Sequence, residues 1–195
     1  MEEDEDEKSQ KIQMIAFTTN EKSHSPNDIM TNYLNNNSHF IIKKNKQLIA
    51  FSTVLPDQKK PTKIMLCTLV DLNIEYEGIT NVNCYLVIID LQKETSKEKL
   101  NEIFTYINQY CDLSKKIFLL GVKSDEEENG IKISEDEIDQ KVNGLNLDYE
   151  YYELNLDNNL EVSDKIVDIF KYCNKVSPDD FLEKNNNGAH SCVIY

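Results

Sequence analysis

The first residues that could bind a ligand follow the first apolar run of the chain. Residues 11–17 (KIQMIAF) have the composition of a buried strand, and a polar segment continues from there to Ser23. Lys22 and Ser23 match the end of the phosphate-binding pattern G-x-x-x-x-G-K-[ST], whose lysine and hydroxyl hold phosphates and magnesium. These two residues are therefore candidate nucleotide-binding residues.

The rest of that pattern is degenerate. Ala16 and Glu21 stand where the two glycines would be, and glycine is what lets such a loop approach the phosphates closely. A carboxylate about 4 Å from a phosphate costs about 4 kcal/mol at an effective dielectric near 20, or roughly a thousandfold in affinity. We therefore expect no bound nucleotide or other cofactor.

A second pair of candidates follows a later apolar run. Lys123 and Asp125 match the lysine and aspartate of the guanine-reading motif N-K-x-D, but Val122 replaces the asparagine. Loss of one polar contact in such a site costs about 1–3 kcal/mol. The motif D-x-x-G also fails, because Ile74 stands where a glycine would follow Asp71. Because no catalytic glutamine is evident, we predict that the chain has no catalytic residues and no enzymatic activity. If the chain does bind a cofactor, the alternative expectation is GTP with magnesium.

The elements that must position these residues alternate along the chain. Apolar runs predict strands at 11–17, 40–42, 48–55, 63–70, 84–90, 116–122 and 149–154. Helical spacing and capping residues predict helices at 26–34, 95–111, 134–144 and 162–173. Buried strands joined by helices form a mostly parallel sheet. The sequence therefore predicts a three-layer α/β/α sandwich, with an antiparallel edge formed by residues 40–55.

Charge divides the chain into three parts. The 195 residues have a formal net charge of -14, and residues 1–10 contain six consecutive acidic residues, typical of a solvated tail. We predict one domain over 11–176 and a flexible polar tail over 177–195. The negative charge disfavours nucleic acid as a partner. No signal peptide or membrane-length apolar run is evident, which indicates the cytoplasm.

The cysteines and histidines predict no metal site. Five cysteines are scattered without C-x-x-C spacing, and three histidines lie far apart, which argues against zinc. Cys67 and Cys84 lie in apolar runs and are expected to be core thiols. Cys192 begins the C-terminal sequence CVIY, which has the form of a prenylation box. We expect membrane attachment only if Cys192 carries such a lipid. Tyr195 is an unusual last residue for a prenylation box and disfavours this modification.

Three stretches give the chain a resemblance to a known family. Residues 63–70 (KIMLCTLV), 84–96 (CYLVIIDLQKETS) and 116–133 (KIFLLGVKSDEEENGIKI) resemble the alpha- and gamma-adaptin-binding proteins in pattern and spacing. That family has a P-loop GTPase-like domain without a working nucleotide site. The resemblance implies a pseudo-GTPase that binds clathrin-adaptor subunits during their assembly for vesicle transport. The family's usual helical C-terminal region is replaced here by a short polar tail.

Two other interpretations fit the same residues. A divergent Ras- or Rab-like GTPase would bind GTP through Lys22, Ser23, Lys123 and Asp125 and anchor through Cys192. A flavodoxin-like protein or enzyme would share the alternation of strands and helices, because a fold does not determine a function.

Overall fold

The computed structural model describes residues 10–20, 25–56, 58–76, 78–125, 130–145 and 147–175. Along the chain the elements are β1 (Lys11–Thr18), α1 (Pro26–Asn36), β2 (His39–Lys44), β3 (Leu48–Thr53), β4 (Thr62–Thr68), β5 (Cys84–Asp90), α2 (Ser96–Tyr110), β6 (Ile117–Lys123), α3 (Glu135–Asn143), β7 (Tyr149–Asn155) and α4 (Asn159–Lys175). Each predicted strand and helix is present, with ends shifted by a few residues. The acidic residues 1–9 and the tail from 176 lie outside the described residues.

All seven strands form one sheet in the order β2-β3-β4-β1-β5-β6-β7. Strands β4, β1, β5, β6 and β7 are parallel to their neighbours in this series, whereas β3 is antiparallel to both β2 and β4. The predicted antiparallel edge is thus confirmed. The parallel strands form a doubly wound arrangement whose order reverses between β1 and β5, and ligands of such sheets bind beyond the carboxyl ends of the strands near that point.

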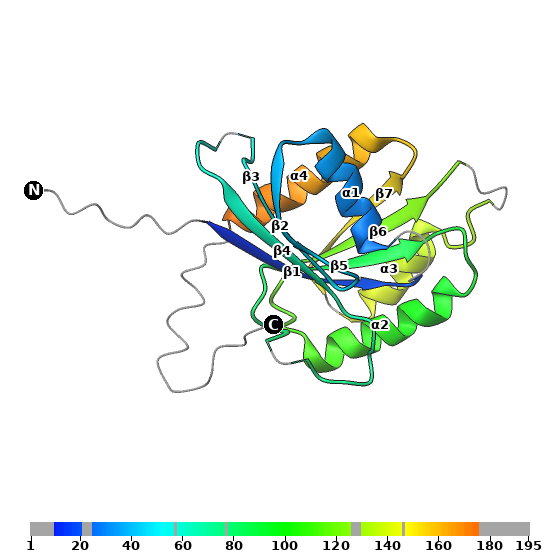
Figure 1. The fold of residues 1–195 in the computed structure, drawn as a ribbon. Coiled ribbons are helices and arrows are strands. Elements are labelled where there is room, and N and C mark those ends of the chain that lie inside the picture. The colour runs from blue at the N-terminus through cyan, green and yellow to red at the C-terminus, as the bar shows by residue number, and fades with distance from the viewer. Residues whose placement is uncertain are drawn as a thin grey trace, which may run out of the picture.

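Helices cover both faces of the sheet and confirm the α/β sandwich. Helices α1 and α4 pack on one face, around a core that contains Tyr33, Phe51, Phe118 and Phe170. Helices α2 and α3 pack on the other face, around a second core that contains Phe17 and apolar residues of β5 and β6. Figure 1 shows the two pairs of helices on opposite sides of the sheet. None of the described helices is long and apolar enough to cross a membrane.

Local sequence explains where the helices begin. Ser25 caps α1, and Asp28 completes a capping box, while Pro26 takes the first helical position. Ser134 and Glu137 form a second capping box at the start of α3. Both boxes satisfy backbone N–H groups that a helix leaves unpaired at its start. Because α1 follows β1 and α3 follows β6, both capped helix starts lie at the carboxyl edge of the sheet, where the candidate ligand-binding residues lie.

Candidate functional site

A cavity lies where β1 and β4 end and α1 begins. Its volume is about 570 Å³. It is lined by Thr18, Ser25, Pro26, Asn27, Lys46, Gln47, Thr68 and Val70. Lys22 and Ser23 belong to the segment between the lining residues Thr18 and Ser25, but both lie outside the described residues, as does Cys192. Their predicted roles therefore stay predictions, and the described walls supply one cationic side chain, Lys46.

The start of α1 at this cavity is already occupied by an anion of the chain itself. The carboxylate of Asp28 accepts hydrogen bonds from the backbone N–H of Ser25 at 2.9 Å and from its hydroxyl at 2.8 Å. A carboxylate in the first turn complements the positive end of the helix dipole. The side chain of Asn27 donates to the carbonyl oxygen of Asn45 at 3.1 Å. A phosphate at this helix end would meet the negative charge of Asp28.

Polar side chains fill the point where the strand order reverses between β1 and β5. Asp90, which is 1% exposed, accepts a hydrogen bond from the amide of Asn20 at 2.7 Å. The backbone N–H of Asp90 donates to the hydroxyl of Thr19 at 2.9 Å, and that hydroxyl donates to Ser96 at 2.9 Å. The ammonium of Lys93 lies 3.6 Å from the Asp90 carboxylate. The buried charge of Asp90 is therefore compensated by neighbouring side chains, as burial of a carboxylate requires.

The two described candidates for guanine recognition, Lys123 and Asp125, lie at and just after the end of β6. The ammonium of Lys123 contacts the carboxylate of Glu153 at 2.6 Å, and this bond raises the pKa of Lys123. The carboxylate of Asp125 accepts from the amide of Asn155 at 3.0 Å. The backbone N–H of Asp125 donates to Asp157 at 2.6 Å. Both candidates thus have partners within the chain.

Gln92 joins the two polar groups into one network. Its side-chain amide donates to the carbonyl oxygen of Ser124 at 2.8 Å, and the backbone N–H of Ser124 donates back to the side-chain oxygen of Gln92 at 2.7 Å. Its backbone N–H donates to Asp90 at 3.0 Å, while the hydroxyl of Ser124 donates to Asp157 at 2.9 Å. The network therefore runs from Asn20 after β1 to Asp157 after β7.

Sequence reasoning missed most members of this network. Thr19, Asn20, Gln92, Ser124 and Asp157 match no motif, and their only signal is that each follows closely on the end of a strand. Val122, at the asparagine position of the guanine motif, is fully buried in the core and offers no polar group. Over the described residues, no three His, Cys, Asp or Glu side chains are grouped so as to hold a metal ion.

Comparisons with known proteins add no assignment. No protein-family model matches the chain, and no curated protein matches it at a significant level.

Proposed function

We propose that this chain is a pseudo-GTPase that binds or assembles other proteins and works without a nucleotide. One observation carries the proposal: Lys123 and Asp125, the described residues that resemble a guanine-reading motif, are bonded to Glu153 and Asn155 of the same chain. Recognition of a base would require these bonds to break. Leaving polar groups of such a site unpaired costs about 1–3 kcal/mol each.

The start of α1 supports the same conclusion. In a working phosphate site, the free N–H groups and the positive dipole of a helix N-terminus face the anion. Here the carboxylate of Asp28 already holds the N–H and hydroxyl of Ser25. The acidic residue Glu21, at a glycine position of the motif, adds a second unfavourable charge.

The proposed partners are clathrin-adaptor subunits, on the basis of the resemblance to the alpha- and gamma-adaptin-binding proteins. The test is a capture assay with the full chain and purified adaptor large and small subunits. We expect retention of at least one subunit in the absence of GTP and no gain when GTP and magnesium are added. If no subunit is retained, the adaptor assignment is wrong; if retention requires GTP, the pseudo-GTPase proposal itself is wrong.

A second candidate function is a divergent Ras- or Rab-like GTPase anchored through Cys192. The cavity of about 570 Å³ beside Lys46 favours it, because this cavity opens at the start of α1, and phosphates commonly bind at the N-terminus of a helix. Intact mass measurement of the chain from eukaryotic cells distinguishes the two. A prenyl group on Cys192 together with co-purified guanine nucleotide would favour the GTPase, and an unmodified, nucleotide-free chain would favour the pseudo-GTPase.

A further inference from the structure

Strand β2 at the edge of the sheet is unusually apolar for a fully exposed element. All six of its residues are exposed, and Phe40, Ile41 and Ile42 are 72%, 44% and 46% exposed. On its inner side β2 pairs with β3, and no described strand pairs with its outer side. An edge strand with free backbone groups and apolar side chains is a template for pairing with another strand.

The charge around β2 is opposite to that of the rest of the protein. Over the described residues from 10 to 68, seven lysines stand against one acidic residue, Asp28. Over the described residues from 69 to 175, eleven lysines stand against nineteen acidic residues. The first group belongs to the β2-β3-β4-β1 end of the sheet and the second follows it through β5, β6 and β7. The sheet is therefore basic at the β2 end and acidic at the β7 end.

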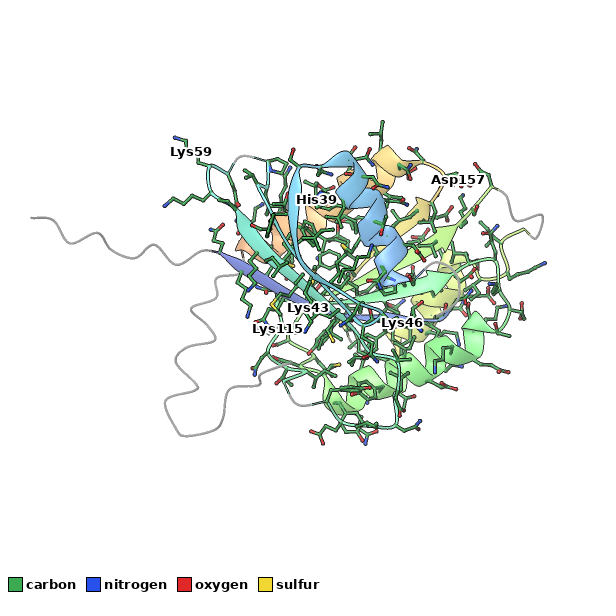
Figure 2. All side chains as sticks on the ribbon, in the orientation of Figure 1. His39, Lys43, Lys46, Lys59, Lys115 and Asp157 are labelled. Atoms are coloured by element: carbon green, nitrogen blue, oxygen red, sulfur yellow. The ribbon has the colours of Figure 1, made fainter. Side chains whose placement is uncertain are left out.

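Figure 2 labels His39, Lys43 and Lys46 along β2 and the turn to β3, and Asp157 at the upper right of the view, just after the end of β7. No ion pair between described residues involves Lys43, Lys44 or Lys46, although the ammonium of Lys44 donates a hydrogen bond to the hydroxyl of Thr31 at 3.2 Å. These charges are therefore available to a partner.

The register of β2 against β3 repeats one pattern on both faces. Phe40 pairs with Ser52 and Lys43 pairs with Ala50, so a bulge at Ile42 puts Phe40 and Lys43 on the same face. Ile41 pairs with Phe51 and Lys44 with Ile49, which places them together on the opposite face. Each face of β2 thus presents an apolar side chain followed by a lysine.

We infer that β2 is a docking strand for an extended segment of a partner protein in which two apolar residues adjoin two acidic residues. Such a segment would add to the sheet edge through backbone hydrogen bonds, as in β-strand addition. Its apolar side chains would cover Phe40 and Ile41, and its carboxylates would face Lys43 and Lys44. This inference names the partner chemistry within the proposed protein-binding function and rests on that function.

Other occupants fit less well. A second copy paired antiparallel through β2 would bring Lys43 and Lys44 beside His39 and Phe40, with no carboxylate to face them, and two chains of net charge -14 repel. A lipid surface has no backbone groups to pair with the outer side of β2. Edge lysines and bulges commonly prevent strand pairing; here they exclude neutral and basic strands and leave acidic strands as acceptable partners.

The test is binding of fluorescent ten-residue peptides to the full chain, followed by anisotropy. Two peptides carry a core of two acidic and two apolar residues, one in each order, and matched peptides carry lysine in place of the acidic residues. We expect at least one acidic peptide to bind and the lysine peptides not to bind. Hydrogen exchange should then slow at the amides of residues 39–42.

Variants locate the binding surface. Phe40→Ser and Lys43→Glu should each weaken binding of the acidic peptide by about tenfold or more, as loss of a central contact does, and Lys43→Glu should gain binding to the lysine peptide. The controls Ile131→Ser and Lys132→Glu change an exposed apolar residue and an exposed lysine in the segment between β6 and α3, and should leave binding unchanged.

In the peptide and variant measurements, any of these results would overturn the inference: no acidic peptide bound at millimolar concentration, equal binding of acidic and lysine peptides, equal losses in the control variants, or dimerisation abolished by Phe40→Ser. Recruitment to vesicles of phosphatidylserine that depends on Lys43 would overturn it in favour of a lipid surface. If an adaptor subunit is captured equally well by the Phe40→Ser variant, β2 is not the docking strand, while the proposed protein-binding function stands.

Discussion

At the scale of single residues, Gly121 shows how closely β6 and β7 approach. A Cβ atom at this position would meet the hydroxyl of Tyr151 and lie 3.0 Å from its ring. The ring of Tyr151 is half-buried and packs with the core beneath α3. Any larger side chain at residue 121 must therefore displace this tyrosine.

We predict that Gly121→Ala lowers the free energy of unfolding by about 1–3 kcal/mol, as overpacking of a core does. The measurement is urea denaturation followed by circular dichroism. The control is Tyr151→Phe, because the Tyr151 hydroxyl has no hydrogen-bond partner among the described residues and its removal should be neutral or stabilising. In the double variant the loss should shrink; a loss of unchanged size would show that the hydroxyl is not the obstacle.

Cys111 lies at the end of α2, and its thiol is partly buried. Burial raises the pKa of this thiol to about 12, above about 8.5 for an exposed cysteine. A raised pKa means that the folded state favours the protonated thiol, so this contribution to stability is present below about pH 8.5 and is lost as the pH rises toward 12. We expect Cys111→Ala to reduce the fall in unfolding free energy between pH 8 and pH 10.5. Parallel pH profiles for the two proteins would contradict this assignment.

At the scale of elements, the capping residues provide an internal comparison. The hydroxyls of Ser25 and Ser134 accept backbone hydrogen bonds at the starts of α1 and α3, whereas Thr95 at the start of α2 makes no such bond. Ser25→Ala and Ser134→Ala should therefore each lower the unfolding free energy by about 1 kcal/mol. Thr95→Ala is the matched control, and we expect it to change stability by less than half as much in the same urea titration. Equal losses at all three sites would mean that the caps are not the cause.

The elements themselves were predictable from the sequence, because their signals are local. Apolar runs marked each strand, while the capping residue Ser25 and the capping box of Ser134 and Glu137 marked two helix starts. The solvent exposure of a strand was less predictable, since it depends on what packs above it. Cys84 is buried as expected, but Cys67 is only partly buried, because its face of β4 lies beside a cavity lined by Met65, Leu69 and Tyr76.

At the scale of the whole molecule, pairing between distant segments decides the chemistry of the site. Parallel pairing of β6 with β7 sets Lys123 opposite Asn155 and Gly121 opposite Glu153. This register brings Glu153 to Lys123 and Asn155 to Asp125, although thirty residues separate each pair. The sequence located Lys123 and Asp125 near a strand end, but their partners depend on strand order and register, which carry no local signal.

The uneven distribution of charge is also a property of the whole molecule. The basic β2 end and the acidic β7 end follow from the sheet order, which gathers residues 10–68 on one side. If the docking strand recognises carboxylates, its binding should weaken as salt rises, because exposed charges are screened over about 10 Å at 0.1 M ionic strength. The peptide titrations should therefore be repeated at several salt concentrations. Binding that does not weaken with salt would indicate purely apolar contact and not recognition of carboxylates.

The central claim is that the residues resembling a nucleotide site serve the fold and bind no nucleotide. The most direct measurement is calorimetric titration of the purified full chain with GTP and magnesium, with an authentic small GTPase as the positive control. We predict no heat of binding up to millimolar GTP, and the same result for Lys123→Ala. Tight binding that Lys123→Ala abolishes would contradict the account and make Lys123 a working contact to the nucleotide.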